Sequence, residues 1–267
     1  MSKKKKNKDL TPYKKSSFKK NWLLPSATLG FFVLVVVSSI FIYSKKTNQT
    51  VQVTNQEPVL VEQSHTKELP SPVYKSQFSV EQALKNVRPR RSYSDDAVSL
   101  ENVSQLLWAA QGVNVEWGDR TAPSSKSTYP LSLYLIANNI TNLENGLYLY
   151  IPGDRQIVHT LDPITSGNYQ TALFNNLNQN SMKNPAGVFV ITGNMNKMAE
   201  AYGGVAHDRE VYMEAGHAAQ NIYLQAESLK LGSVALGSFD EGIIRNIINT
   251  PEEETIIYLI PFGQIKN

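Results

Sequence analysis

Two short segments of this sequence carry side chains that could bind a phosphorylated, planar cofactor such as a flavin. Arg90-Arg91-Ser92 follows the first predicted helix of the folded part, and two guanidinium groups beside a hydroxyl can hold a dianionic phosphate through paired hydrogen bonds. Pro123-Ser124-Ser125 lies in a predicted turn, which would expose backbone and hydroxyl donors to the polar edge of a ring. Each motif alone also has an ordinary interpretation. The two arginines would fit a solvated surface pair, and Pro-Ser-Ser would fit a loop without a ligand.

Two predicted helices place the arginines. Ser79 and Gln82 have the spacing of a capping box and open a short helix that ends before Pro89, so the arginines lie at its exit. Ser99 caps a second helix, and Gly112 is placed to end it. The second helix has apolar residues at the i, i+3, i+4, i+7 spacing of one buried face: Val103, Leu106, Leu107 and Ala110.

Apolar runs after the Pro-Ser-Ser turn predict a central sheet of about five strands. The runs are 131–137, 146–152 and 156–161 around a Pro-Gly-Asp turn, 186–192 and 255–260. A long helix is expected over 209–231 with its end at Gly232. Its inward face would carry small and apolar residues: Ala215, Ala218, Ala219, Ile222, Ala226 and Leu229. The pattern predicts an α+β domain whose central mixed sheet is flanked by helices, without repeated βαβ units.

An apolar run precedes this domain. Residues 23–43 contain no charge, are long enough to span a bilayer and have Trp22 and Tyr43 at their ends, as interfacial anchors would be. A buried core helix and a cleaved signal peptide are the alternatives, but the run is long and ends without a small-residue cleavage site. The sequence therefore predicts a basic head over 1–22, a transmembrane helix over 23–43, a flexible tether over 44–77 and a folded domain over 78–267.

Charge is distributed unevenly along the 267 residues. Residues 1–46 contain eleven lysines and one acidic residue, Asp9, whereas the remainder has 15 basic and 22 acidic residues. Because nine lysines precede the apolar run, we expect the N-terminus in the cytoplasm and the C-terminal domain outside it. An acidic domain argues against a nucleic-acid partner. With no cysteine and no metal-ligand spacing among the four histidines, no metal site is predicted.

The ordered motifs resemble the nitroreductase superfamily, and more narrowly its SagB-type or thiazole-oxidase branch. The resemblance covers about residues 79–265. It rests on six blocks: Arg90-Arg91-Ser92, 106–112, 120–125 leading to 129–131, 214–221, 236–240 and 261–263. It implies an FMN-dependent homodimer with the cofactor at the subunit interface.

The resemblance assigns cofactor contacts residue by residue. Arg90, Arg91, Ser92 and Ser94 would meet the phosphate and ribityl chain, and Lys266 falls where many relatives have an arginine that closes over the phosphate. Pro123, Ser124 and Ser125 would line the pyrimidine edge of the ring, with Ser127 beside them. Gly237 and Ser238 match a turn whose backbone amides face flavin N5. Lys126 and Ser127 depart from the Gly followed by Ala or Asn that related sequences commonly have, and Ser94 lacks the positive charge of classical nitroreductases.

Three residues are candidates for a catalytic role: Lys126, Glu214 and His217. Lys126 could stabilise the anionic hydroquinone or point to solvent. Glu214 and His217, three residues apart on the long helix, could form an acid/base pair or a structural hydrogen bond at the dimer-forming helix.

The expected function is a membrane-anchored FMN-dependent oxidoreductase. It would move a hydride between NAD(P)H or a reduced substrate and an organic acceptor through flavin N5. The alternatives are an azoline dehydrogenase acting on a peptide substrate and a non-catalytic surface module that binds a flavin or another ligand. The sequence has no nucleophile elbow, P-loop or dinucleotide-binding glycine motif, so hydrolase, nucleotide triphosphatase and Rossmann readings lose their main support.

Overall fold

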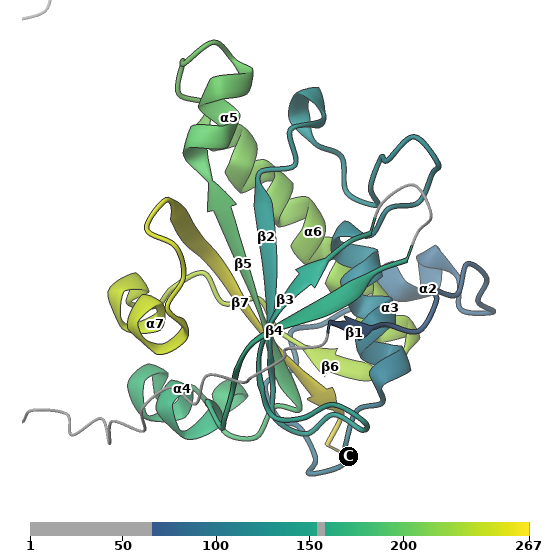
Figure 1. Ribbon diagram of the computed structural model, residues 1–267. Coiled ribbons are helices and arrows are strands. Elements are labelled where there is room, and N and C mark those ends of the chain that lie inside the picture. The colour runs from purple at the N-terminus through teal and green to yellow at the C-terminus, as the bar shows by residue number, and fades with distance from the viewer. Residues whose placement is uncertain (1–65, 154–157, 267) are drawn as a thin grey trace, which may run out of the picture. The chain divides into compact units, whose positions relative to one another are not determined.

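The computed structural model describes residues 66–153 and 158–266 (Figure 1). The predicted basic head 1–22, the predicted transmembrane helix 23–43 and the tether up to residue 65 lie outside the described residues. Within the two described ranges, none of the helices has both the length and the apolar character that crossing a bilayer requires.

The domain is built on a seven-stranded sheet in the order β1-β4-β3-β2-β5-β7-β6. All strand pairs in the described ranges are antiparallel. The strands are β1 (Lys67–Glu68), β2 (Leu131–Ala137), β3 (Gly146–Ile151), β4 (Thr160–Ser166), β5 (Gly187–Asn194), β6 (Leu231–Ser233) and β7 (Glu254–Gln264).

The prediction of a mixed sheet of about five strands is therefore wrong in two respects. The described sheet has seven strands, and its neighbouring strands all run antiparallel. β1 has two residues and β6 has three, which is too short for an alternating pattern to show. Hydrophobic alternation also carries no information on whether a strand's neighbours run parallel or antiparallel to it. The second strand of the predicted hairpin, 156–161, lies instead at Thr160–Ser166.

Helices flank the sheet as predicted, and both predicted N-caps are confirmed. Ser79 and Gln82 form the capping box of α2, and the Ser99 side chain caps α3. The helices are α2 (Val80–Asn86), α3 (Leu100–Gln111), α4 (Gln170–Leu177), α5 (Met195–Ala201), α6 (Asp208–Ser228) and α7 (Glu241–Ile248), with 3-10 turns η1 (Ser125–Ser127) and η2 (Asn180–Met182). The long helix α6 ends before the predicted residue 231, because Lys230 has a positive φ of 59° and Gly232 belongs to β6, where it pairs with Gly263.

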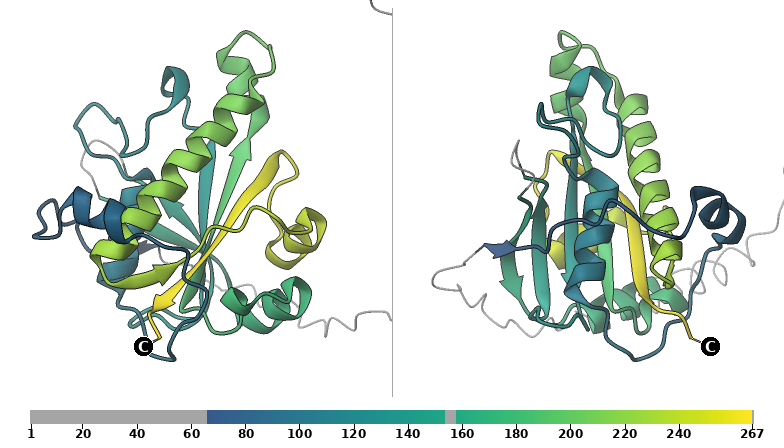
Figure 2. Two further views of the ribbon diagram at one scale, coloured as in Figure 1. Left: turned by 180° about the vertical axis from the view of Figure 1, so that it is seen from behind. Right: turned by 90° about the vertical axis from the view of Figure 1, so that its right-hand side faces the viewer.

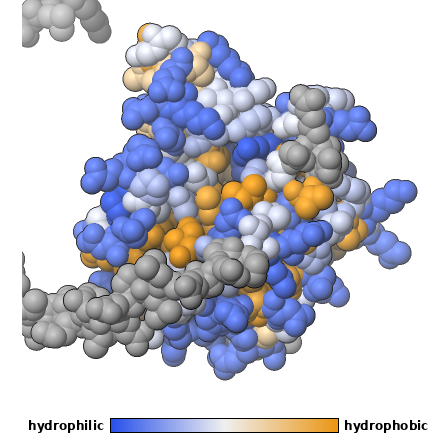
Figure 3. Space-filling view, viewed as in Figure 1, coloured by the Kyte–Doolittle hydropathy of each residue, from blue (hydrophilic) through white to orange (hydrophobic). Residues whose placement is uncertain are grey.

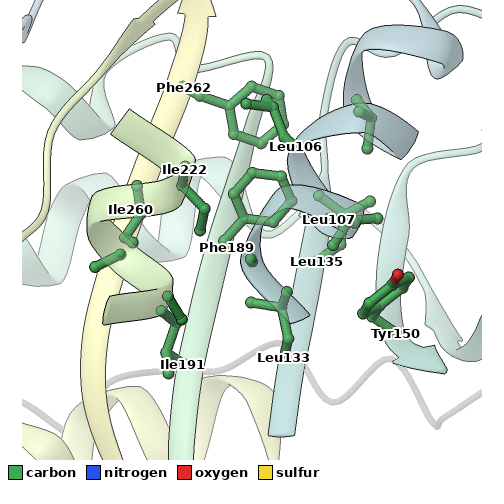
Figure 4. Packing of buried hydrophobic residues seen from close by; sticks show 14 of the residues in the cluster. Leu106, Leu107, Leu133, Leu135, Tyr150, Phe189, Ile191, Ile222, Ile260 and Phe262 are labelled. Carbon is green, nitrogen blue, oxygen red and sulfur yellow. The ribbon is translucent and has the colours of Figure 1, made fainter. Parts of the chain in front are cut away.

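Alternate residues of the central strands β2, β5 and β7 face two separate cores. Leu133 and Leu135 of β2 pack on the side of α3 and α6, where Phe189 and Phe262 stack with ring centroids 4.5 Å apart (Figure 4). Tyr134 and Ile136 face the opposite side, which α4 and α7 cover. In the space-filling view, apolar side chains gather in the middle of one face and polar side chains surround them (Figure 3).

Residues 67–79, which we call the strap, pack against the domain although they belong to the predicted tether 44–77 and the first two residues of the predicted domain. β1 pairs with β4, and Leu69 is buried. The hydroxyl of Ser104 donates to the carbonyl of Pro70, and the side chain of Gln105 pairs with the backbone of Val73. The ordered fold thus begins earlier than expected, because partners distant in sequence fix a segment that has no local pattern of its own.

Candidate functional site

The Arg90-Arg91-Ser92 segment runs beside the end of the sheet formed by β6 and β7. The Arg90 N–H donates to the Ser233 carbonyl over 2.9 Å, and the Ser94 N–H donates to the Gln264 carbonyl over 3.0 Å. Tyr93 forms an antiparallel bridge with Ile265, and this register places Ser92 opposite Lys266. The fold therefore brings the two predicted phosphate-binding groups, which are about 175 positions apart in the chain, to one edge.

Tyr93 fixes this segment. Its side chain is only 1% exposed and lies on the paired glycines Gly232 and Gly263, where an added Cβ would come within 2.9–3.2 Å of the tyrosine. Its hydroxyl is 2.9 Å from the Arg90 carbonyl and 3.0 Å from the Pro261 carbonyl. Burial raises the pKa of Tyr93, so this hydroxyl stays protonated and remains a donor.

The side chains at this edge are mainly cationic. Arg90 lies 3.8 Å from Glu227 of α6 (Nη2 to Oε1), and its Nε is buried without a hydrogen-bond partner among the described residues. Arg91, Ser92 and Lys266 are exposed. Arg90 thus contacts the carboxylate and keeps a buried N–H donor available, while Arg91 and Lys266 add two exposed cations to the edge. We call Arg90, Arg91, Ser92 and Lys266 the basic edge.

Ser94 does not join the basic edge through its side chain. Its hydroxyl donates to the Asp96 carboxylate over 2.8 Å.

The Pro123-Ser124-Ser125 loop is held by one carboxylate. Glu214 Oε1 accepts a hydrogen bond from the Ser124 hydroxyl (3.0 Å) and from the Ser125 N–H (2.7 Å), and Ser124 Oγ in turn accepts from the Tyr129 N–H. Lys126, Ser127 and Tyr129 adopt positive φ angles of 53°, 51° and 47°. Three left-handed residues that are not glycine are unfavourable, and the Glu214 contacts help to hold the turn that contains them.

Glu214 is 5% exposed, and this burial raises the pKa of its carboxyl group. The hydrogen bonds from Ser125 and Ser124, and the charges of His217 and Arg120, act against that rise without cancelling it. His217 itself is exposed on α6, and no hydrogen bond joins it to Glu214 in the described ranges. The predicted acid/base pair is therefore not assembled as a hydrogen-bonded pair.

Lys126 contacts the end of α5. Its Nζ donates to the Ala201 carbonyl over 2.9 Å and lies 3.9 Å from the centre of the Tyr202 ring. Tyr202 also stacks on His207 with ring centroids 3.7 Å apart, and its hydroxyl is 2.5 Å from Ser125 Oγ. These contacts join the loop to the α5–α6 connection and occupy the ammonium group that was a candidate for stabilising a reduced ring.

Gly237 and Ser238 follow β6 and are both exposed. The preceding residue, Leu236, exchanges two backbone hydrogen bonds with Leu259 of β7, which ties the turn to the sheet. The Ser238 carbonyl accepts a long hydrogen bond from Gln179. This turn therefore presents backbone from a fixed position, as its predicted role requires.

The basic edge and the Pro-Ser-Ser loop lie at opposite ends of α6. Arg90 is beside Glu227 and the loop is held by Glu214, and these two anchors are 13 residues apart on one helix. At 1.5 Å per residue the separation along the helix axis is about 20 Å. Figure 2 shows the helix crossing the sheet over this length. One chain thus does not bring the two predicted groups of cofactor contacts together around one ring.

Sequence reasoning missed the positioning residues. Tyr93 directly follows Arg90-Arg91-Ser92. Its contacts with two glycines could not be predicted, because the glycines are distant from it in the sequence. No separate role was predicted for Arg120, which lies in the block 120–125. Its guanidinium donates to Gln111 and lies 4.5 Å from the centre of the Tyr129 ring. For Glu214 the sequence predicted an acid/base pair or a structural hydrogen bond with His217, but it did not predict the hydrogen bonds from Ser124 and Ser125.

Comparison with known proteins defines the class. The sequence profile of the Nitroreductase family matches residues 86–264. A Methanocaldococcus jannaschii protein, provisionally named a nitroreductase, is 35% identical over 188 residues, which is 70% of this chain and 92% of the relative. The chain belongs to the nitroreductase family.

Solved structures share the fold. A Ralstonia eutropha protein of provisional nitroreductase name matches with a TM-score of 0.65 at 24% identity, over 78% of this chain and 93% of that one. A similarly named Anabaena variabilis protein matches with a TM-score of 0.62 at 22% identity over 74% of this chain, which spans only 41% of the Anabaena chain. The E. coli microcin synthetase McbBCD complex, solved with truncated pro-MccB17 bound, matches with a TM-score of 0.55 at 18% identity over 88% and 94% of the two chains.

The buried position of Glu214 predicts a pH dependence of stability. Since its pKa is raised on folding, its contribution is fully present below the ordinary glutamate pKa and is lost as pH rises through the raised value. The free energy of unfolding of the native protein should therefore fall, relative to that of Glu214→Gln, as urea titrations are moved from pH 4 towards pH 7.

Glu210→Gln is the matched control on the same helix. The pKa of Glu210 is lowered, mainly by its own backbone N–H, so the corresponding difference should run in the opposite direction. A difference for Glu214→Gln that is flat, or that runs in the same direction as that for Glu210→Gln, would contradict the assignment.

Proposed function

We propose that the protein is an FMN-dependent oxidoreductase that moves a hydride between NAD(P)H or a reduced substrate and an organic acceptor. FMN supplies the hydride-accepting N5 atom when it is bound. The observation that carries the proposal is the combination of a basic edge at one end of α6 with a donor loop at the other. Membership of the nitroreductase family supports the same conclusion.

The residues present fit the phosphate of such a cofactor. The unpartnered Arg90 Nε–H and the exposed Arg91, Ser92 and Lys266 offer charge-assisted donors from one edge. Tyr93 and the β6–β7 pairing hold the backbone beneath them, so these groups would not have to be ordered on binding. The Ser94 hydroxyl already donates to Asp96, so Ser94 would contribute to the phosphate site through its backbone only.

The separation of the two groups along α6 supports a homodimer with two sites. If the α6 helices of two copies pack antiparallel, the Glu227 end of one helix lies beside the Glu214 end of the other, and each site takes its basic edge from one chain and its loop from the partner. The outward face of α6 is suited to this contact. Tyr212 and Met213 are exposed there, and no atom lies within 4 Å of the place a Cβ would take at Gly216.

The protein's own contribution to the chemistry would be orientation and charge. Pro123, Ser124 and Ser125 would direct donors to the pyrimidine edge, and the backbone of Gly237 and Ser238 would face N5. Glu214 would position the loop, since its Oε1 is already used by two donors. Lys126 would stabilise the loop through Ala201 and Tyr202.

We also propose the topology expected from the sequence, with an anchor at residues 23–43 and the domain outside the cytoplasm. NAD(P)H is scarce in that place, so a reduced substrate as the hydride donor fits this topology. The motif blocks shared with the SagB-type branch support an azoline dehydrogenase as the finer alternative. A non-catalytic binding module is the other, and the intrachain contacts of Lys126 and Glu214 favour it.

Anaerobic addition of NADPH tests catalysis directly. An oxidoreductase should lose its visible flavin absorption under these conditions and recover it when an organic acceptor such as a quinone is added. A flavin that binds with normal stoichiometry but is reduced by neither NADPH nor NADH would contradict a nicotinamide donor and leave a reduced organic substrate as donor, or the binding module.

Replacing Arg90 should weaken FMN binding. Arg90→Ala removes a charge-assisted contact of about 1.5–3 kcal/mol, which corresponds to a roughly ten- to hundredfold rise in Kd. The measurement is a calorimetric titration of apoprotein with FMN. Arg88→Ala is the control, since Arg88 lies two residues away, is exposed and hydrogen-bonds only to nearby carbonyls. Equal affinities for the two variants would rule out the phosphate assignment.

Mixed dimers test the shared site. We expect Arg90→Ala/Arg91→Ala and Ser124→Ala/Ser125→Ala homodimers each to bind FMN weakly. In a purified heterodimer of the two, one site combines both defects and the other is fully native, so one FMN per dimer should bind with native affinity. If each chain formed a complete site by itself, the heterodimer would contain no native site and binding would stay weak.

A further inference from the structure

A cavity of about 580 Å³ lies between the strap and helices α2, α3 and α6. It is separate from the basic edge, because its α6 residues, such as Asn221, Leu224 and Gln225, lie on a different side of the helix from Glu227, which contacts Arg90. None of the residues assigned to the cofactor lines it. A volume of this size is within the range of small-molecule sites.

The strap forms one wall of the cavity and lies before the family-matched residues 86–264. This wall is fixed at three points. β1 pairs with β4, the Pro70 carbonyl is within hydrogen-bonding distance of Ser104 and His159, and Gln105 both donates to and accepts from the Val73 backbone. The strap wall of the cavity is therefore held in place by contacts to the rest of the domain.

The lining has aromatic rings and uncharged polar groups. Tyr74 of the strap meets Trp108 of α3 edge to face, with ring centroids 5.5 Å apart and an interplanar angle of 73°. Tyr74 remains 63% exposed, so its ring is available to a ligand. The side-chain amides of Asn102, Asn221 and Gln225 also line the cavity. Asn221 donates to the Thr121 carbonyl and Gln225 hydrogen-bonds to Gln105 and Ser228, so the carbonyl oxygen of Asn221 and the amide of Asn102 are the groups left for a ligand.

The charges of the lining exclude an anionic ligand. Lys75 and Glu101 provide one charge of each sign, and no arginine contributes to the lining. A phosphate or nucleotide site would instead need several cations or a free helix N-terminus, and the N-termini of α2 and α3 beside the cavity are already capped by Ser79 and Ser99. Flat rings with amides around them are suited to a planar ring that carries a neutral hydrogen-bonding group.

We propose that the strap cavity is a second ligand site, which binds an uncharged, planar aromatic molecule. The site requires neither flavin nor turnover, so it goes beyond the proposed oxidoreductase activity and can fail independently of it.

The test uses the full chain saturated with FMN, so that the cofactor site is filled. Indole-3-acetamide and indole-3-acetate share one ring and differ in charge, and calorimetry measures the binding of each. We expect saturable binding of the amide, one per chain and at least tenfold tighter than that of the carboxylate. Absent binding of the amide at millimolar concentration, or equal binding of both compounds, would overturn the proposal.

Two variants locate the binding. Tyr74→Ala removes an exposed ring from the wall and should raise the Kd of the amide at least tenfold. Leu84→Ala, an exposed apolar residue of α2 that does not line the cavity, should leave the Kd unchanged. Unchanged affinity in Tyr74→Ala would overturn the assignment to this cavity. A second copy of the chain covering the cavity would also overturn it, and would appear as absent binding of the amide by the FMN-saturated dimer.

Discussion

The close packing of α6 on the sheet is the constraint on which the rest of the structure depends. Four alanines, Ala215, Ala218, Ala219 and Ala226, are buried on its inner face. Small side chains allow a helix to approach the layer beneath it closely, and larger ones would push it outwards. The donor loop is held to this helix at Glu214 and the basic edge contacts it at Glu227, while Asn221 between them lines the separate strap cavity. A shift of α6 would therefore change every one of them together.

Two carboxylates of α6 hold neighbouring segments in place, one of them in a buried environment and the other in a partly exposed one. Glu214 is buried, and its two hydrogen-bond donors replace the water that burial removes. Glu227 faces Arg90 at 3.8 Å, a distance that leaves the guanidinium able to bind another anion. The first carboxylate holds a backbone shape that the loop would not keep alone. The second holds a cation without neutralising the whole basic edge.

The sequence was sufficient for features that depend on local chemistry. Ser79 with Gln82 and Ser99 predicted the starts of α2 and α3, and the apolar runs predicted β2, β5 and most of β7. Features that depend on distant partners could not be predicted. β6 is three residues long, and the strap is ordered by Ser104, Gln105 and β4. The site motifs were recognisable, but their placement at opposite ends of α6 required the fold, since spacing along the chain does not give distance in space.

The two sheet edges have a consequence for solubility. An open edge strand presents unpaired N–H and C=O groups that can pair with another chain and start aggregation. Here β1 covers part of β4, whose Pro163 cannot donate to a neighbour, and the Arg90 N–H bonds to Ser233 at the other edge. The segments that build the cavity wall and the basic edge thus also shield the sheet. Damage to either segment would expose a strand as well as a binding group, so it would lower solubility and ligand binding together.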